Sequence, residues 1–199
     1  MDAFTQLLEP YLSPIASPLT DALALSGLEK IRENLVPACT HGAGDVEVRA
    51  GMAYASMLSG VVLANAGLGI VHGLASPLGG YFPIPHGVVC GTLVASATES
   101  NIAALRRKGA TAALEKYAKV GALFGGKGGA AGPGAGTDYY CDLLVERLRE
   151  WTEILALPRL GGYGIREADL PRIADKAGNR NNPVELSRDE ICALLARRL

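Results

Sequence analysis

Two of the three histidines in this chain lie in one stretch that contains no Asp, Glu, Lys or Arg. The stretch reads GLGIVHGLASPLGGYFPIPHG over residues 67–87, and none of those four residue types occurs over residues 50–98. Such a run is typical of a protein interior, where an enclosed imidazole needs a partner. The partner of His72 and His86 is either a metal ion or a backbone carbonyl group, and residue type leaves both alternatives open.

A site for iron or zinc needs further oxygen or nitrogen donors. His72 and His86 are 14 residues apart, with glycine and proline between them, so they cannot share one helix face. They can face one pocket from two elements, His72 at the end of a helix and His86 at the start of the next. Asp2 and Gln6 offer two more donors at the i, i+4 spacing of one helix side. Spacing therefore permits a site of these four residues without establishing it.

The segments that must position these residues carry sequence patterns typical of helices. Ser17-Pro18 is a cap followed by proline at the first helical position, and Ser187 with Glu190 forms a capping box. No stretch alternates apolar and polar residues over a strand length, so we predict an all-α domain of seven to eight helices. The segment 45–66, rich in small residues, should be the central buried helix. The other expected helices span residues 2–12, 18–36, 87–107, 109–124, 138–155, 166–177 and 187–199.

Composition excludes several classes of function. The chain of 199 residues has 19 basic and 20 acidic residues, which gives no electrostatic case for nucleic acid or an anionic membrane surface. Residues 51–71 are long enough to span a membrane, but glycine, serine and asparagine dilute their hydrophobicity and no basic cluster flanks them. The four cysteines form no CxxC pair and no signal peptide is evident, so we expect reduced thiols and a cytoplasmic location.

One segment is of low complexity. It reads GGKGGAAGPGAGT over residues 125–137, and GALFGGK at 121–127 matches most of a phosphate-binding loop. Gly128 stands where that loop needs a magnesium-binding hydroxyl, and the segment follows a helix where the loop would follow a strand. We therefore expect a flexible loop between two helices.

Several segments together resemble one enzyme family, the iron-containing (group III) alcohol dehydrogenases. MDAFTQLLEPYLS, PLTDALALSGL and GLGIVHGLASPLGGYFPIPHGVVCG are similar to its C-terminal domain, and AGNRNNPVELSRDEICAL is similar to its closing segment. Members have an N-terminal Rossmann-like half that holds NAD(P) and an all-helical half that holds a divalent metal, often Fe²⁺ and sometimes Zn²⁺. The resemblance implies reversible oxidation of an alcohol to an aldehyde or ketone in the cleft between the halves, with the metal as a Lewis acid.

The resemblance also implies residue roles. Asp2, His72 and His86 match the family's metal ligands, and Gln6 occupies the position of a fourth ligand that is usually histidine. Ser76 stands where members often have a further histidine near the substrate, so no catalytic side chain is assigned. The neighbouring residues of the expected substrate pocket are Gly79, Gly80, Tyr81 and Phe82, where the glycines permit close backbone approach. The alternative for these glycines is a tight turn without substrate contact.

Two functional hypotheses follow. In the first, residues 1–199 are one all-helical metal and substrate domain, without the N-terminal NAD(P)-binding domain and inactive alone. Its partners would be that domain and a small alcohol or aldehyde. In the second, the chain is a non-catalytic helical scaffold or dimerisation module that has lost metal binding. Both predict an exposed, partly apolar face and a homo-oligomer, and neither involves nucleic acid or a membrane.

Overall fold

The computed structural model describes residues 1–125 and 135–199. This part of the chain contains no strand, so the predicted all-α class is confirmed. Residues 1–125 and 135–199 form nine α-helices where seven to eight were expected, together with two short 3-10 turns. The phosphate-loop match and the expected loop both fall partly on residues 126–134, which lie outside the described residues. The helices are α1 (Asp2–Leu12), α2 (Pro18–Cys39), α3 (Val46–Ala66), α4 (Ile70–Tyr81), α5 (His86–Lys108), α6 (Thr111–Phe124), α7 (Thr137–Ile154), α8 (Leu170–Ala174) and α9 (Arg188–Ala196).

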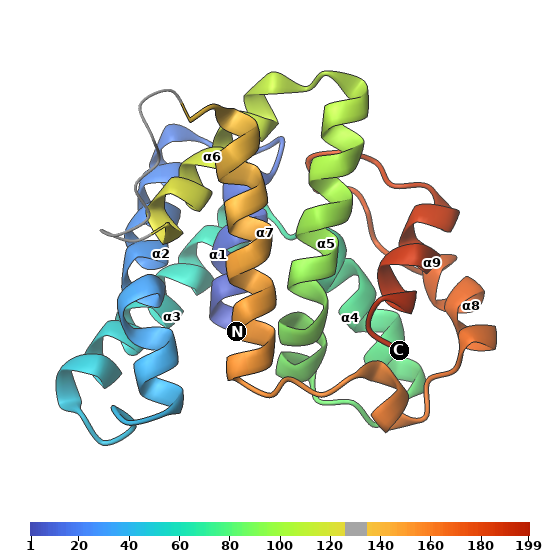
Figure 1. Ribbon diagram of the computed structural model, residues 1–199, viewed down its shortest axis with the longest axis horizontal. Coiled ribbons are helices and arrows are strands. Elements are labelled where there is room, and N and C mark those ends of the chain that lie inside the picture. Colours follow the sequence, from blue (N-terminus) through green and yellow to red (C-terminus); the bar gives the residue numbers. More distant parts are fainter. Residues whose placement is uncertain (126–134) are drawn as a thin grey trace.

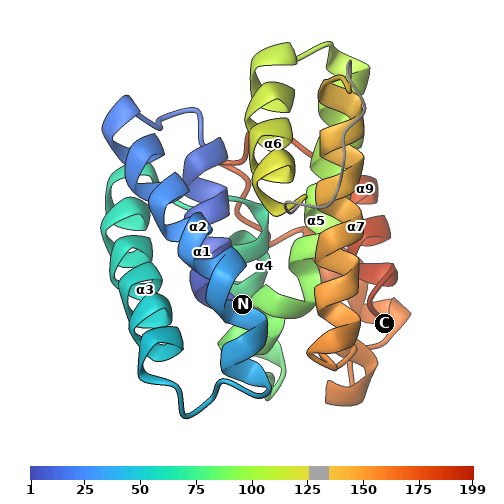
Figure 2. The same cartoon turned by 60° about the vertical axis from the view of Figure 1, so that its left-hand side comes forward.

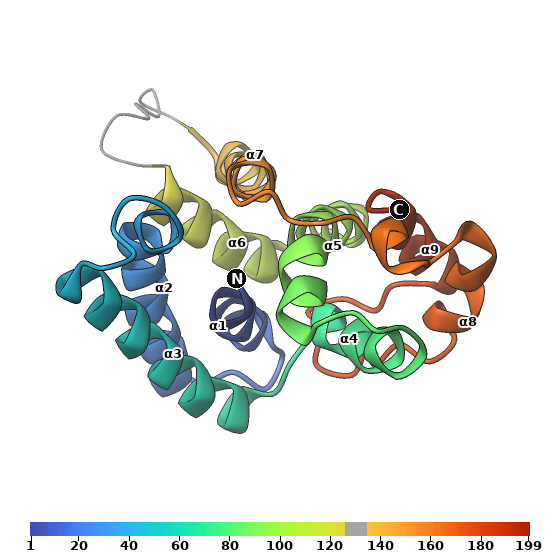
Figure 3. The ribbon, with the colours of Figure 1, turned by 90° about the horizontal axis from the view of Figure 1, so that it is seen from below.

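Helix α1 lies at the centre of the first half of the fold. Figure 3, seen nearly along its axis, shows α2, α3 and α6 around it, with α5 on its other side. Almost every residue of α1 from Phe4 onward is buried, because its apolar side chains meet neighbours on several sides. Phe4 packs edge-to-face against Phe124 and Trp151, with ring centroids 5.8 and 5.4 Å away. The residues at the start of α1 are therefore fixed by the core that follows them.

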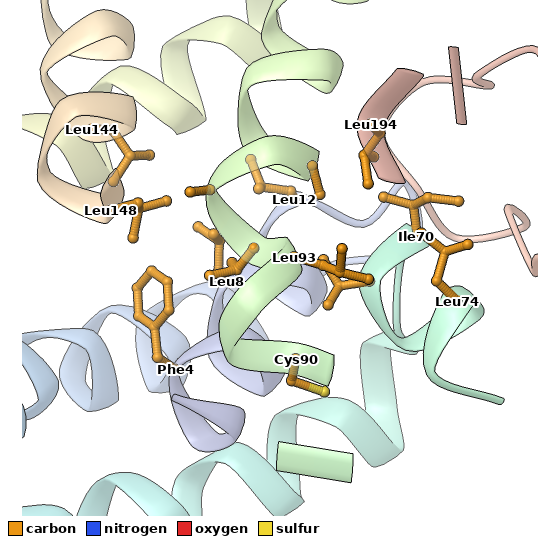
Figure 4. Close-up of a cluster of buried hydrophobic side chains, with 14 of the residues drawn as sticks. Phe4, Leu8, Leu12, Ile70, Leu74, Cys90, Leu93, Leu144, Leu148 and Leu194 are labelled. Atoms are coloured by element: carbon orange, nitrogen blue, oxygen red, sulfur yellow. The ribbon is translucent and has the colours of Figure 1, made fainter. Parts of the chain in front are cut away.

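Helix α5 is the second central element. It contacts α4, α7, α1, α6 and α9, and it runs through the middle of the molecule in Figure 1. Figure 4 shows its Leu93 among apolar side chains from α1, α4, α7 and α9. Because α1 and α5 are both enclosed, the beginning of each is held in a fixed place relative to the other.

The expectation for α3 was wrong. The segment was predicted to be the central buried helix, but it lies at the edge of the molecule against α1 and α2 (Figure 2). Only Ala55, Leu58, Ser59, Val62 and Ala66 of α3 are buried. Its small residues make the helix apolar on all sides, a pattern that sequence reasoning associates with burial. At the edge, α3 leaves the larger apolar side chains of Tyr54, Met57 and Val61 exposed.

The stretch between α3 and α5 forms a separate helix, α4, and this corrects the expected position of His72. His72 lies in the first turn of α4, not at the end of the preceding helix, whereas His86 begins α5 as expected. Pro77 stands inside α4 and cannot bond to the carbonyl oxygen of Gly73 four residues earlier. That oxygen instead accepts a hydrogen bond from the backbone N–H of Gly178, at 3.2 Å. A long-range contact thus stabilises a helix that local signals argue against.

Two helices are long and apolar enough to cross a membrane by length and composition, α3 and α5. In α5 this reflects a core position, since 78% of its most apolar window is buried, against 28% for α3. The charge-free segment 51–71 is divided between α3 and α4 by a break at residues 67–69. It therefore does not form one continuous spanning helix.

Candidate metal centre

The beginnings of three helices meet at one point. Asp2 is the first residue of α1, His72 lies in the first turn of α4, and His86 is the first residue of α5. Oδ1 of Asp2 lies 3.2 Å from Nε2 of His72 and 3.7 Å from Nε2 of His86. The structure thus brings together three of the four residues that the sequence offered as metal ligands, although 70 residues separate Asp2 from His72.

Cys90 is the fourth side chain at this point, and sequence reasoning missed it. Its Sγ lies 3.6 Å from Nε2 of His72 and 3.6 Å from Nε2 of His86. One ligand atom from each of Asp2, His72, His86 and Cys90 lies within 4.8 Å of all the others, and we call these four residues the donor cluster. The signal was the spacing of His86 and Cys90, four residues apart on one helix. In Figure 4 the sulfur lies at the edge of the buried apolar side chains.

Gln6 lies beside the donor cluster, with its amide turned to two other groups. Its Nε2 donates to Oδ2 of Asp2 at 3.3 Å, and its Oε1 accepts from the hydroxyl of Ser59 at 2.9 Å. The two carboxylate oxygens of Asp2 therefore have different partners, since Oδ1 faces the histidines and Oδ2 faces Gln6. In this orientation the Gln6 amide oxygen does not point into the cluster.

Behind His72 lies a buried carboxylate, Glu9, that sequence reasoning also missed. Oε2 of Glu9 lies 2.7 Å from Nδ1 of His72, and Oε1 accepts the backbone N–H of Val71 at 2.6 Å. Because an ionised carboxylate only accepts hydrogen bonds, Nδ1 carries a proton and Nε2 is turned toward the cluster. Burial lowers the pKa of His72, but the hydrogen bond and charge of Glu9, together with Asp2, outweigh it, so the net pKa is raised.

The N-terminus of α4 has no cap from its own sequence, and distant side chains cap it. The N–H of Val71 donates to Glu9, and the N–H of Ile70 donates to Oδ1 of Asn182 at 3.3 Å. The buried amide of Asn182 also exchanges two hydrogen bonds with that of Asn101, at 3.0 and 2.7 Å. His72 is thus positioned by residues from both ends of the chain.

The residues expected at the substrate pocket lie on the outer part of α4 and just beyond it. Ser76 is exposed, one turn after His72. Gly79 and Gly80 are exposed and helical, so they do not form the tight turn considered as their alternative, and a Cβ on either would meet no atom of the chain within 4 Å. The guanidinium carbon of Arg172 lies 4.9 and 5.4 Å from the ring centroids of Tyr81 and Phe82. This surface is open toward the outside of the chain.

A divalent metal fits the chemistry of the donor cluster. It combines a carboxylate, two imidazoles and a thiol, all of which bind first-row metals, and Glu9 supplies the partner that metal-bound histidines usually have. Asp2 and Glu9 together offer two formal negative charges to a doubly charged ion.

Comparison with known proteins gives the family. The model of the Fe-containing alcohol dehydrogenase family, C-terminal, matches residues 1–199. The chain belongs to this family. Among curated relatives, the 1,3-propanediol dehydrogenase of Citrobacter freundii is 33% identical over 98% of this chain and 48% of its own length. Alcohol dehydrogenase 4 of Saccharomyces cerevisiae is 30% identical, with the same two coverages.

Solved structures agree with this assignment to the Fe-containing alcohol dehydrogenases. A crystal structure of 1,3-propanediol oxidoreductase superposes with a TM-score of 0.87 and 31% sequence identity, and it covers 100% of this chain and 50% of the other. The chain therefore spans about half the length of these relatives, and it corresponds to the family's C-terminal domain.

Proposed function

We propose that this chain is the metal- and substrate-binding domain of an NAD(P)-dependent oxidoreductase that interconverts an alcohol with an aldehyde or ketone. The observation that carries the proposal is the convergence of Asp2, His72 and His86 from three helix N-termini, with Glu9 behind His72. In this proposal the three converging residues hold a divalent ion, Fe²⁺ or Zn²⁺. Gln6 and Cys90 are the two candidates for a fourth donor.

When bound, the metal would supply Lewis-acid chemistry that favours the alkoxide form of an alcohol. The chain's own residues orient the metal ligands and border the space for the substrate. Glu9 fixes the ring of His72, and the open surface beside Ser76, Gly79 and Gly80 leaves room for a small substrate. Tyr81 and Phe82, stacked with Arg172, border the same end of α4.

Hydride transfer would need a nucleotide-binding domain as partner. Residues 1–125 and 135–199 contain no strand and so no strand–turn–helix unit that could hold a dinucleotide. We propose that the 199-residue chain alone is inactive. The test mixes the purified chain with NAD(H) or NADP(H) and a panel of alcohols and aldehydes. No change in nicotinamide absorbance is expected, and turnover by this chain would contradict the requirement for the partner domain.

Self-association and a cytoplasmic location belong to the same proposal. On α3 the exposed side chains of Tyr54, Met57 and Val61 follow one another at helical spacing and form an apolar stripe, which favours a homo-oligomer. The four cysteines are free thiols, as expected in a reducing compartment. Light scattering should give a mass above that of one chain at high concentration. A strictly monomeric protein would contradict the self-association.

Metal content tests the central part of the proposal. After loading with Fe²⁺ or Zn²⁺ and dialysis, elemental mass spectrometry should find close to one ion per chain. His72→Ala and His86→Ala should lose the ion, whereas His41→Ala, which changes the exposed third histidine, should keep it. Circular dichroism checks that each variant remains folded. A folded wild-type chain that retains no metal would contradict the proposal and favour a non-catalytic helical scaffold.

A further inference from the structure

We propose that Cys90, and not Gln6, is the fourth protein donor to the metal at Asp2, His72 and His86, and that this donor set favours zinc over iron. The inference rests on the metal-binding function proposed above. It also assigns Gln6 a different task, the positioning of Asp2. Four kinds of observation support it: distances, burial, the orientation of Gln6 and the chemistry of sulfur.

Three separations in the donor cluster match the edges of a zinc tetrahedron. Zn–S bonds of about 2.3 Å and Zn–N bonds of about 2.05 Å, at tetrahedral angles, place sulfur and nitrogen about 3.6 Å apart. The two observed separations of Sγ of Cys90 from Nε2 of His72 and of His86 are both 3.6 Å. The same arithmetic gives about 3.3 Å for nitrogen and oxygen. Asp2 Oδ1 lies 3.2 and 3.7 Å from the two Nε2 atoms.

A hydrogen bond from the Cys90 thiol explains these distances less well than a shared metal ion does. A thiol has one proton and can donate it to one imidazole nitrogen at a time, yet Sγ of Cys90 is equally distant from two. The residue has no exposed surface, so its sulfur contacts only the protein. Since His86 and Cys90 lie one turn apart on α5, the helix itself directs both side chains to one point.

Both polar atoms of the Gln6 amide already form hydrogen bonds. Its oxygen accepts from Ser59 on α3, and its nitrogen donates to Oδ2 of Asp2. Rotation of the amide to present oxygen to a metal would break the hydrogen bond to Asp2. In the observed orientation Gln6 holds the Asp2 carboxylate so that Oδ1 faces the histidines, which makes it a positioning residue.

Sulfur changes which metal the site prefers. A thiolate is a soft donor that suits zinc, whereas amide and carboxylate oxygens suit harder ions. Binding of Zn²⁺ replaces the proton on Sγ of Cys90, and that proton leaves to solvent. A set of two nitrogens, one oxygen and one sulfur is therefore a better zinc site than the set with the Gln6 amide.

Cobalt spectroscopy distinguishes the two donors. Co²⁺ replaces zinc in such sites, and a bound thiolate gives a sulfur-to-cobalt charge-transfer band in the near ultraviolet. The full chain loaded with Co²⁺ should show this band, and so should the control Cys192→Ser. Gln6→Ala should bind Co²⁺ more weakly, because Asp2 loses its positioning residue, and should still show the band at saturating Co²⁺. Cys90→Ser should lose the band. Persistence of the band in folded Cys90→Ser, or its absence from a wild-type chain that binds one Co²⁺, overturns the role of Cys90 and leaves the proposed metal-binding function intact.

If Cys90→Ser does not fold, the cobalt spectrum of the wild-type chain alone decides whether Cys90 is a ligand. A wild-type chain that binds no Co²⁺ or Zn²⁺ at all overturns both this inference and the proposed function. Competition against a chromophoric chelator then measures selectivity. Zinc affinity should fall at least about tenfold in Cys90→Ser, because loss of even an outer partner of a metal ligand costs that much. Fe²⁺ affinity should fall less, because sulfur is the softer donor, so the ratio of zinc affinity to Fe²⁺ affinity should decrease. An unchanged ratio overturns the claim of zinc preference.

Discussion

Nδ1 of His72 lies 2.7 Å from Oε2 of Glu9, while Nε2 of the same ring faces Asp2 at 3.2 Å. The Glu9 carboxylate therefore orients the imidazole ring from one side, and the Asp2 carboxylate faces the nitrogen on its other side. Glu9 is buried and its second oxygen accepts the N–H of Val71, so both of its acceptors are used within the first turn of α4. The orientation of His72 is set by helix α1 as well as by the helix that carries it.

Replacement of Glu9 by glutamine should weaken metal binding. Glutamine has one carbonyl oxygen in place of two carboxylate oxygens, so either Val71 or His72 loses its acceptor. An amide N–H toward Nδ1 would also favour the imidazole tautomer with its proton on Nε2. We expect zinc affinity to fall by about 10- to 100-fold in chelator competition. Glu33→Gln, on the exposed side of α2, is the control, and an equal loss there would contradict this role of Glu9.

Removal of the Asn182 amide should destabilise the start of α4. Asn182→Ala leaves the N–H of Ile70 and the amide of Asn101 with fewer buried partners. We expect a loss of about 2 to 4 kcal/mol in the free energy of unfolding, measured by urea denaturation. Asn65→Ala, at an exposed position on α3, should cost less than about 1 kcal/mol. Equal effects would show that the Asn182 network does not stabilise the fold.

Two glycines of the same helix should respond in opposite ways to alanine. A Cβ on Gly73 would lie 1.8 Å from the carbonyl oxygen of Gly178, so Gly73→Ala must push the two segments apart, at a cost of about 1 to 3 kcal/mol or more. Gly79→Ala meets no atom within 4 Å and should be neutral or stabilise by up to about 1 kcal/mol. Thermal unfolding of both variants checks this, and a stable Gly73→Ala protein would contradict the close contact of the two glycines.

Thiol reactivity should separate the cysteines. Burial raises the pKa of Cys141 to about 11, and its Sγ donates to the carbonyl oxygen of Leu114. Since the thiolate is the reactive form, iodoacetamide at pH 8 should label exposed Cys39 and leave Cys141 unmodified in the native chain. Mass spectrometry of proteolytic peptides locates the label. Labelling of Cys141 as fast as Cys39, with the fold intact, would contradict its burial.

Local sequence signals predicted much of the fold. Ser17 caps α2 and Ser187 caps α9 through a capping box, as their sequence patterns indicated. These signals act between residues that are close in the sequence, so they do not depend on how the helices pack. The place of α3 could not be predicted, because composition describes how apolar a helix is and not which neighbours cover it. Helix α4 was missed because the hydrogen bond between Gly73 and Gly178 joins segments about 100 residues apart.

The candidate site was predictable only in part. Asp2, His72 and His86 were named from residue type together with a family resemblance, and the structure brings them together. Cys90 and Glu9 were not named, although each lies close to His72. A cysteine in an apolar run is usually a core residue, and Glu9 carries its charge inside a helix whose burial the sequence did not reveal. Three-dimensional proximity was needed to connect them with the histidines.

Anomalous diffraction at the zinc absorption edge, from crystals of the zinc-loaded chain, shows where the metal binds. One strong peak is expected within bonding distance of Asp2, His72 and His86, with Sγ of Cys90 as the fourth ligand. A well-ordered crystal with no peak at this point, or with zinc bound only at surface groups such as His41, would contradict metal binding by these residues.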